Sequence, residues 1–415
     1  MSIITSALQQ LKQTAPNLLL LNDNQRAEVL LTLAALLETN TSSIITHNQR
    51  DLQKMSPSDP RYDRLQLTTE RIIALANDLR KVAQLDSPLG KKLAEKTLAN
   101  GLHLVKQSVP LGVVAVIYEA RPNVTIDVFS LCFKSGNAVV LKGGSDAWES
   151  NQILVTLIKQ SLAQHQINPE IVYLMPPERE TVYELLNAVG LVDVCIPRGS
   201  RGLIEFVRTN AKIPVIETGA GIVHTYFDSS GNITIASQII KNAKTRRVSV
   251  CNALDCLLVA EDRLAELNQL IRPLAEKNVI VYADDKSYHA LASLYPTELL
   301  EHATDESFGC EFLDYKLAIK TVTNIDEAIA HIQKFTSGHS EAIISEDKQA
   351  ITKFINLVDA AVVYINASTA FTDGGEFGMG AEIGISTQKL HARGPMALPE
   401  LTSYKWVVTG TGQIR

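Results

Sequence analysis

Hydrophobic residues recur at three- and four-residue intervals through the first hundred positions of the chain. The clearest case is the run 25–38, whose apolar side chains fall on one face of a helix. The pattern changes after Gly101, where residues 103–109 read as an extended strand punctuated by Pro110. The chain therefore begins with helices and passes into a region of strands.

Short, continuous apolar runs follow at 113–117 and 138–141, and a helix-length stretch at 124–134 separates them. Buried parallel strands have this pattern, and a strand–helix–strand unit of this length is a right-handed crossover. The alternation continues with helices expected at 150–165, 181–189 and 202–209, and with strands expected at 171–174, 192–196 and 214–216. This pattern predicts a doubly wound α/β domain.

A second α/β run begins near Ile233. Its predicted strands lie at 254–259, 279–282, 317–322 and 361–365, and a glycine-rich tail from Asp373 ends in an alternating stretch at 404–408. The fold class expected for the chain is therefore α/β, with more than one domain in its 415 residues.

Cys251 lies in a polar turn between a helical pattern and an apolar strand, where its sulfur is reachable. Lys244, Arg246 and Arg247 lie within seven residues of it, and nearby cations favour the nucleophilic thiolate. Cys256 lies inside the apolar run and fits a buried structural cysteine better. We therefore predict Cys251 as a nucleophile; the alternative is a structural cysteine beside a solvated basic patch.

Composition excludes several classes of protein. Apolar residues make up 46% of the chain and charged residues 20%, and the formal charge is 39 − 45 = −6 with a pI near 5.9. This balance gives no support to binding of nucleic acid or of an anionic membrane. No secretory signal and no apolar run near the ~20 residues of a membrane span are visible, so we expect a cytoplasmic protein.

The five cysteines are scattered and odd in number: Cys132, Cys195, Cys251, Cys256 and Cys310. They form no C-x-x-C pair and no Cys/His cluster at zinc spacing, so we expect neither a disulfide framework nor a metal site.

Two loops between a predicted strand and a predicted helix are candidates for binding phosphate, at 142–146 and at 197–202. Their glycines permit close backbone approach, and helix N-termini favour anions. The G-x-G-x-x-G fingerprint is absent, and the alternative for each loop is an ordinary turn. Lys142 and Ser145, with no glutamate at the end of that strand, suit the 2′-phosphate of NADP, although Asp146 weakens this point.

Three longer stretches carry a family resemblance, at 110–125 (PLGVVAVIYEARPNVT), 242–252 (NAKTRRVSVCN) and 371–395 (FTDGGEFGMGAEIGISTQKLHARGP). With the shorter stretches 337–342 and 363–368, they make the chain resemble the gamma-glutamyl phosphate reductases. These enzymes, also called glutamate-5-semialdehyde dehydrogenases, are the proline-pathway branch of the aldehyde dehydrogenase superfamily. The departures are modest, and the main ones are Arg246 and Val248 where the family usually has glutamine and proline.

The resemblance implies a role for individual residues. Cys251 is the nucleophile, and the Asn123 amide with the backbone N–H of Cys251 forms the oxyanion hole. The resemblance implies that Lys142 and Glu311 bind the cofactor, and the two loops add Gly143, Ser145, Gly199 and Ser200 as candidates. Candidates for binding the substrate are Arg121, Lys244, Arg246 and Arg247, with the division between phosphate and carboxylate left open. Glu217 occupies the position of the general base of hydrolytic relatives, and its alternative role is structural.

The function implied is NADPH-dependent reduction of L-glutamate 5-phosphate to L-glutamate 5-semialdehyde and phosphate through a thioester, the second step of proline biosynthesis. The alternatives are a coenzyme-A-acylating aldehyde dehydrogenase and a catalytically silent cofactor-binding or scaffold protein. Cys251 argues against silence, and the glycine-rich stretch 371–395 argues against the coenzyme-A branch.

The resemblance also implies a Rossmann-type cofactor domain at 1–97 and 112–228 and a catalytic domain at 229–362. Residues 98–111 and 384–415 would form a β-flap and C-terminal tail. Because an exposed two-stranded flap is marginal alone, we expect a homo-oligomer, at least a dimer. A glutamate kinase that supplies the substrate is a further expected partner.

Overall fold

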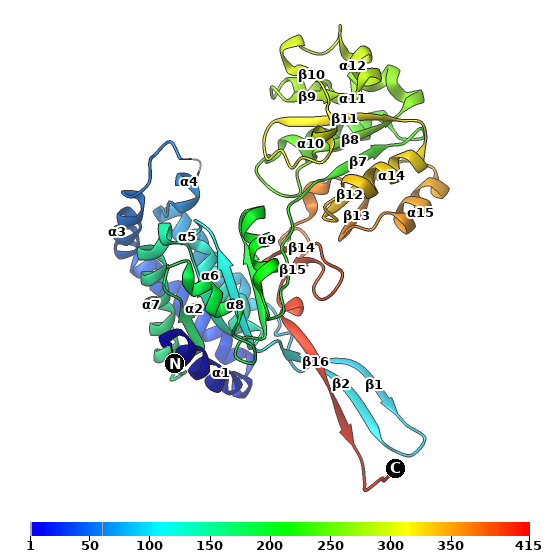
Figure 1. Cartoon of the computed structure of the whole chain (residues 1–415). Coiled ribbons are helices and arrows are strands. Elements are labelled where there is room, and N and C mark those ends of the chain that lie inside the picture. The colour runs from blue at the N-terminus through cyan, green and yellow to red at the C-terminus, as the bar shows by residue number, and fades with distance from the viewer. Residues whose placement is uncertain (1, 60) are drawn as a thin grey trace. The chain divides into compact units, whose positions relative to one another are not determined.

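The structure is a computed structural model that describes residues 2–59 and 61–415 (Figure 1). The chain divides into two compact units. Unit 1 comprises Met1–Thr218, Gly378–Gly384 and Met396–Arg415, and unit 2 comprises Gly219–Phe377 and Ile385–Pro395. The boundary falls before Gly219, whereas the sequence placed it at residue 228; the assignment of cofactor binding and catalysis to separate domains stays a prediction.

Unit 1 combines helices with one parallel and one antiparallel sheet. Its helices are α1 (Ile3–Thr14), α2 (Asp23–Thr39), α3 (Thr41–Leu52), α4 (Tyr62–Leu65), α5 (Thr69–Gln84), α6 (Asn123–Lys134), α7 (Trp148–Gln164), α8 (Glu180–Leu186) and α9 (Arg201–Asn210). Its strands are β1 (Lys92–Thr97), β2 (His103–Pro110), β3 (Val113–Tyr118), β4 (Ala138–Lys142), β5 (Val172–Leu174), β6 (Val194–Arg198) and β16 (Thr402–Thr409).

The parallel sheet of unit 1 has the strand order β5-β4-β3-β6. All six residues of β3 are buried, as its continuous apolar sequence predicted. The chain leaves β3 for β4 and β5 on one side and then returns to place β6 on the other side. The carboxyl ends of β3 and β6 therefore form a topological switch point, where ligands bind in sheets of this kind.

The strand predicted at 214–216 is wrong as an element, because it forms only an isolated bridge between Cys195 and Val215. Pro214 has no backbone N–H to donate to a ladder, which limits the pairing to this one position.

The helices of unit 1 follow the three- and four-residue periodicity of the sequence. At the start of α2, the Asn22 side chain accepts the Gln25 N–H and the Gln25 side chain accepts the Asn22 N–H, which forms a capping box. Buried leucines such as Leu30 and Leu33 line the helix where it packs on α5 and α7. Across the described residues no single helix is apolar and long enough to cross a membrane, and only the bent pair α2 and α3 passes that test jointly.

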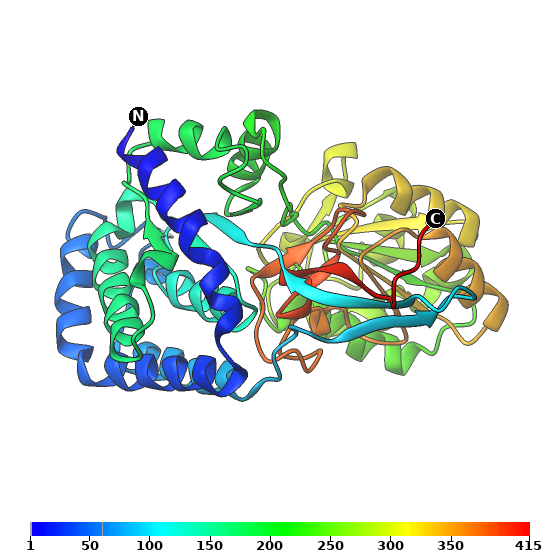
Figure 2. The ribbon, with the colours of Figure 1, turned by 90° about the horizontal axis from the view of Figure 1, so that it is seen from below.

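An antiparallel sheet of three strands, in the order β1-β2-β16, completes unit 1. Figure 2 shows the cyan strands β1 and β2 beside the red β16. The β2–β16 register runs from His103 opposite Thr409 to Pro110 opposite Thr402. The sequence predicted that this part of the chain pairs with the tail, but it did not predict β1. Both outer strands expose most of their side chains.

Unit 2 is a second parallel α/β unit. Its strands are β7 (His224–Phe227), β8 (Cys256–Ala260), β9 (Ile280–Ala283), β10 (Leu300–His302), β11 (Lys316–Val322), β12 (Ser340–Ile344) and β13 (Val362–Ile365). Its helices are α10 (Ile233–Thr245), α11 (Leu267–Ala275), α12 (Asp285–Leu291), α13 (Asp305–Phe308), α14 (Ile325–Phe335) and α15 (Lys348–Leu357). The strand order is β10-β9-β11-β8-β7-β12-β13, and the short strands β14 (Gly384–Ser386) and β15 (Gly394–Met396) pair with each other.

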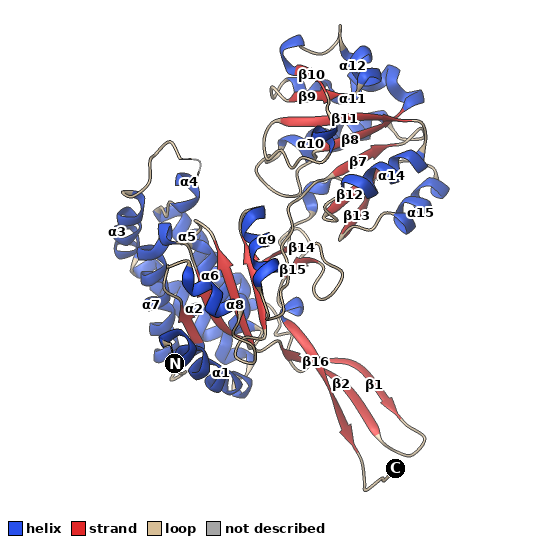
Figure 3. Cartoon of the chain, viewed as in Figure 1, coloured by secondary structure: helices blue, strands red, loops and turns tan. Residues whose placement is uncertain are grey.

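The seven-stranded sheet has a hydrophobic core on each face, and Figure 3 shows helices covering the sheet. Alternate residues of β8 enter different cores: Leu257 and Val259 pack with α10 and α11, whereas Cys256 and Leu258 pack with α14 and α15. Successive side chains of a strand point to opposite faces, so a sheet covered on both faces needs an apolar residue at every position. This requirement explains the unbroken apolar run of β8.

Candidate active site

Cys251 lies in the loop between α10 and β8, as predicted, and is half-buried. Its Sγ atom lies 3.2 Å from Nε2 of His339, which directly precedes β12. Since β8 and β12 each neighbour β7 in the sheet, the amino ends of these strands bring the thiol and the imidazole together. A thiol in contact with a ring nitrogen is the arrangement that activates a cysteine nucleophile.

His339 is fully buried, and its hydrogen bonds continue away from the thiol. Its Nδ1 lies 2.8 Å from the Ser340 hydroxyl, which contacts the Thr372 hydroxyl at 2.7 Å, and Tyr364 OH reaches the same Thr372 oxygen at 2.8 Å. Burial lowers the pKa of His339 to about 4, so the ring is neutral at pH 7. A neutral imidazole has one acceptor nitrogen. Because the lowered pKa makes this ring a weak base, it can take the thiol proton only as the sulfur attacks, and it does not hold a thiolate at rest.

His339 was not among the residues predicted from the sequence. The stretch 337–342 that contains this residue was recognised as similar to a family stretch, and this was the one available signal. It assigned no role, because the contact joins residues 88 positions apart.

The cysteine loop is held by a segment that follows β13. The Asn252 amide donates to the carbonyl oxygens of Ala370 and Thr372, and the Thr369 hydroxyl donates to Asn252 O at 2.8 Å. On the other side, a Cβ atom at Gly221 would lie 1.6 Å from Cys251 O, so only glycine allows this approach. The sulfur is therefore presented by a loop with little freedom to move.

The three predicted cations of the loop differ in exposure. Lys244 is fully buried, and its Nζ donates to Leu254 O at 2.9 Å and lies 3.9 Å from Asp255. Burial lowers the pKa of Lys244 and raises that of Asp255. Lys244 thus supports the loop from inside the unit, whereas Arg246 and Arg247 are exposed and available to an anion.

Glu311 is half-buried and lies before β11, at the same edge of the sheet. Its Oε1 accepts the Gly221 N–H at 2.8 Å. The glycine that adjoins the cysteine loop therefore also positions this carboxylate.

In unit 1, Asn123 is the first residue of α6 and is half-buried. Its Nδ2 donates to Asp127 Oδ2 at 3.0 Å, and this hydrogen bond fixes the orientation of the Asn123 amide. Burial raises the pKa of Asp127 to about 6. Arg121, two residues before Asn123, is exposed.

The first predicted phosphate loop leads into a helix whose N-terminus is occupied by a carboxylate. At the N-terminus of α7, the backbone N–H groups of Glu149 and Ser150 donate to the carboxylate of Asp51, as does the Ser150 hydroxyl. Asp51 is fully buried, so this helix N-terminus already binds an internal anion. These two amides are therefore occupied by a side chain of the protein itself, and phosphate binding by the loop 142–146 stays a prediction.

The side chains of that loop remain candidates for other contacts. Lys142 is buried and donates to the carbonyl oxygens of Gly143 and Pro177, and burial lowers its pKa. Gly143 is required by packing, since a Cβ there would lie 2.2 Å from the Asn151 amide nitrogen. Ser145 lines a cavity of about 450 Å³ whose wall also carries Asp51, Lys54, Met55, Ser56, Asp59, Arg61 and Asp146.

The second predicted phosphate loop lies at the switch point between β3 and β6. Here the Ser200 N–H and hydroxyl donate to the Glu119 carboxylate at 2.8 and 3.1 Å, and Ser200 caps α9. A Cβ at Gly199 would lie 2.6 Å from a Glu119 oxygen. Glu119 is exposed, whereas Asp51 is fully buried.

Glu217 is half-buried in unit 1, where one of its oxygens lies 3.8 Å from Arg208. The alternative roles of Glu217, a base or a structural group, stay predictions.

The two parallel sheets and the cysteine ahead of a strand define an aldehyde-dehydrogenase-like protein, and this confirms the predicted fold class. The crystal structure of an acetylating aldehyde dehydrogenase from Geobacillus thermoglucosidasius has this fold, with a TM-score of 0.69, 17% identity and coverage of 99% of this chain and 97% of that chain. No family model matches the chain.

The particular family follows from closer relatives. A Legionella pneumophila protein named gamma-glutamyl phosphate reductase is 62% identical over 412 residues, which cover 99% of this chain and 99% of that relative. The crystal structure of the Thermotoga maritima gamma-glutamyl phosphate reductase has a TM-score of 0.95 at 38% identity and covers all of both chains. The chain belongs to the gamma-glutamyl phosphate reductase family, as its sequence motifs indicated.

Proposed function

We propose that this chain reduces L-glutamate 5-phosphate to L-glutamate 5-semialdehyde with NADPH and releases phosphate, which is the second step of proline biosynthesis. The observation that carries the proposal is the contact between Cys251 and His339 in a member of this family. A thiol paired with a neutral imidazole suits attack on an activated acyl group.

In the proposed mechanism, Cys251 Sγ attacks the carbonyl carbon of the acyl phosphate while His339 Nε2 takes the thiol proton. The Asn123 amide and the backbone N–H of Cys251 stabilise the oxyanion. Phosphate leaves without a strong acid, and a thioester remains on the sulfur. NADPH supplies the hydride for its reduction. As the resulting thiohemiacetal collapses, His339 returns the proton to the thiolate.

Ser200 and Glu119 support a cofactor site at the switch point of unit 1. A carboxylate already accepts the Ser200 N–H at the start of α9, and a phosphate can accept the same hydrogen bonds once Glu119 turns away. Lys142, Gly143 and Ser145 would serve the adenosine half of NADPH. In the cavity beside Ser145, Lys54 and Arg61 are each paired with a carboxylate, Asp51 at 3.5 Å and Asp59 at 2.7 Å. The proposed contact to a 2′-phosphate therefore rests on Lys142. Glu311 would hold the nicotinamide ribose.

For the substrate, the exposed guanidinium groups of Arg121, Arg246 and Arg247 are the proposed partners of the phosphate and the carboxylate. Arginine binds both groups through paired N–H donors. The burial of Lys244 favours a structural role instead, and we do not include it among the substrate contacts.

We also propose that the chain forms a homo-oligomer through the sheet β1-β2-β16. Its edge strands leave backbone groups for pairing with another chain. β16 exposes Tyr404, Trp406 and Val408, each by half or more of its surface, and Leu93 of β1 is 55% exposed. Burial of these side chains by a second copy explains their apolar character. A glutamate kinase would supply the labile acyl phosphate, and we place both enzymes in the cytoplasm.

The test is the reverse reaction. We expect glutamate 5-semialdehyde, present with its cyclic form pyrroline-5-carboxylate, to reduce NADP when inorganic phosphate is added. Coenzyme A in place of phosphate should give no turnover. Turnover with coenzyme A but not with phosphate would indicate an acylating aldehyde dehydrogenase instead. Absence of turnover with either acceptor would reject the enzyme assignment.

A further inference from the structure

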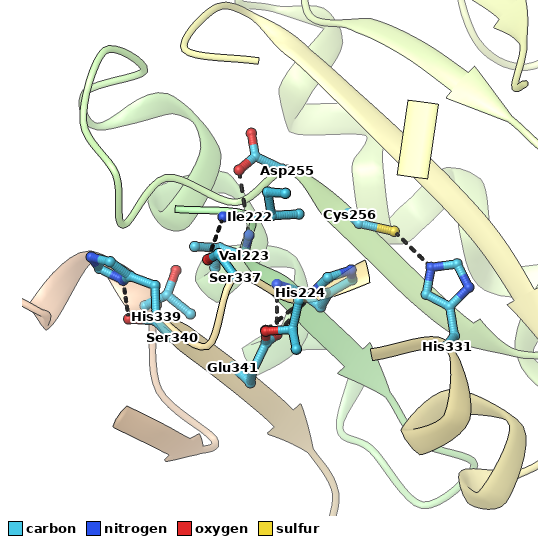
Figure 4. Close-up of polar contacts among 12 residues, drawn as sticks. Ile222, Val223, His224, Asp255, Cys256, His331, Ser337, His339, Ser340 and Glu341 are labelled. Carbon is cyan, nitrogen blue, oxygen red and sulfur yellow. Dashed lines mark hydrogen bonds and ion pairs between the residues drawn. The ribbon is translucent and has the colours of Figure 1, made fainter. Parts of the chain in front are cut away.

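A second set of cysteine and histidine side chains lies inside unit 2 (Figure 4). It consists of His224 on β7, Cys256 on β8 and His331 on α14, and the donor atoms of these three residues lie within 4.8 Å of one another. His224 and Cys256 are fully buried. The proposed mechanism uses none of the three.

The sheet register explains how this cluster forms. Glu341, His224 and Cys256 occupy facing positions on the adjacent strands β12, β7 and β8. Facing residues of neighbouring strands point to the same side of a sheet, and α14 covers that side with His331. Nε2 of His331 lies 3.7 Å from the Cys256 sulfur.

Glu341 determines which nitrogen of His224 faces the cluster. The fully buried Glu341 carboxylate accepts the backbone N–H of His224 at 2.9 Å and the ring Nδ1–H at 3.1 Å, and it also accepts the Thr336 hydroxyl. Because a carboxylate only accepts, Nδ1 carries a ring proton, and Nε2 is the nitrogen that remains for a metal ion. That buried Nε2 has no hydrogen-bond partner within the described parts of the chain.

We propose that His224, Cys256 and His331 bind one zinc ion or a similar late transition-metal cation. Two imidazoles and a thiolate are ligands that zinc prefers, and a carboxylate behind a ligating histidine is a common outer contact of zinc sites. The separation of two ligand atoms in such a site is about 3.4–3.8 Å, from bonds of about 2.0–2.3 Å. The Cys256–His331 pair already has this spacing. Because the ligand atoms lie within 4.8 Å of one another, His224 needs to move inward by at most about 1.4 Å, from 4.8 − 3.4.

The charges of the site also fit a divalent cation. Binding releases the Cys256 thiol proton to solvent, and the resulting thiolate with the Glu341 carboxylate neutralises the two positive charges. A buried ion of this kind is tolerated when its charge is balanced and its ligands are held. The ion would join β7 and β8 to α14.

The test measures bound metal directly. Because Cys251 and His339 form another sulfur–nitrogen pair, the experiment uses the full chain carrying Cys251→Ser. After treatment with a chelator, the protein is loaded with Zn²⁺ or Co²⁺ and passed through a desalting column. We expect one ion per chain by mass spectrometry of the metal. For Co²⁺, we also expect a near-ultraviolet thiolate charge-transfer band.

Three substitutions in this background locate the ion. Cys256→Ser should remove the charge-transfer band, and both Cys256→Ser and His331→Gln should weaken Zn²⁺ binding at least tenfold. Glu341→Gln should weaken it by about 10–100-fold, as is usual for an outer contact. Cys310→Ser, which removes a half-buried thiol outside the cluster, is the matched control and should bind as before.

Circular dichroism and thermal melting check that each variant is folded. If Cys256→Ser fails to fold, the partly exposed His331 decides the matter through His331→Gln. Metal below one ion per chain at saturation, or full binding that survives His331→Gln, would overturn the proposal.

Discussion

Replacing His339 with glutamine tests whether this residue takes the proton of Cys251. Glutamine keeps similar size and an N–H donor, but it has no nitrogen that can accept a proton. An ordinary thiol with a pKa near 8.5 is about 3% ionised at pH 7. Without its proton acceptor, Cys251 would react only through this fraction, so kcat/KM should fall by about thirtyfold or more at pH 7.

The pH profile separates proton transfer from a structural effect. His339 is neutral above pH 5 because burial lowers its pKa to about 4, so its own titration leaves the native profile between pH 6 and 9 unchanged. In His339→Gln, activity should rise about tenfold per pH unit and level off near pH 8.5, as thiolate forms. The assay is phosphate-dependent NADP reduction at fixed ionic strength, with alkylation of the Cys251 peptide by iodoacetamide as a second readout.

His289→Gln, which alters an exposed histidine on α12, is the control and should behave as the native protein. A His339→Gln enzyme with native activity and profile would refute the reasoning. So would a loss at pH 7 that a higher pH does not restore in a folded variant, because His339 would then only support the fold.

Four further outcomes are expected. Cys251→Ser should abolish turnover with the fold and NADPH binding intact, since a serine hydroxyl stays protonated beside a ring whose pKa is about 4. Cys256→Ser should mainly lower thermal stability, because it places a hydroxyl in an apolar core, and the reverse result would reassign the nucleophile. Lys142→Ala should weaken NADPH binding more than NADH binding, by about 1.5–3 kcal/mol in titration calorimetry, and equal losses would exclude a 2′-phosphate contact. Glu217→Gln should leave phosphate-dependent NADP reduction unchanged, whereas loss of a rapid phosphate-independent oxidation would show a hydrolytic enzyme. Because the pKa of His339 falls from 6.5 to about 4 on folding, the unfolded chain binds one more proton than the folded chain between these pH values. The free energy of unfolding should therefore drop by about 3 kcal/mol as the pH falls from 6.5 to 4, and urea titrations of His339→Gln should lack this contribution.

The sequence predicted most parallel strands because buried strands need apolar residues at every position, as in β3 and β8. It did not mark β7, which begins with His224 and Thr225, as a strand. Both residues are buried, and the His224 ring is accommodated by the Glu341 carboxylate on the adjacent strand. Such a compensation depends on strand pairing and cannot be read from a local pattern.

The candidate site was predictable where the signal was local. The position of Cys251 in a loop follows from its neighbours, but its contact with His339 depends on how β8 and β12 are placed beside β7. The same holds for the phosphate loops, because the carboxylates that meet their helices, Asp51 and Glu119, come from distant segments. Long-range placement of charge was the missing information.

The proposed metal site also depends on contacts between distant parts of the chain. A search for closely spaced cysteines and histidines cannot detect His224, Cys256 and His331, which are separated by whole strands and helices. For this reason no metal site was expected from the sequence, and the three residues are brought together only by the register of the sheet and by α14.

The central claim is that an acyl group resides on Cys251 and leaves to phosphate. Its most direct test mixes the enzyme with glutamate 5-semialdehyde and NADP in the absence of phosphate. We predict a burst of one NADPH per active site that then stops, with the mass of one glutamyl group added to the Cys251 peptide, and steady turnover once phosphate is added. Sustained turnover without phosphate, or an acyl group on another residue, would contradict the account.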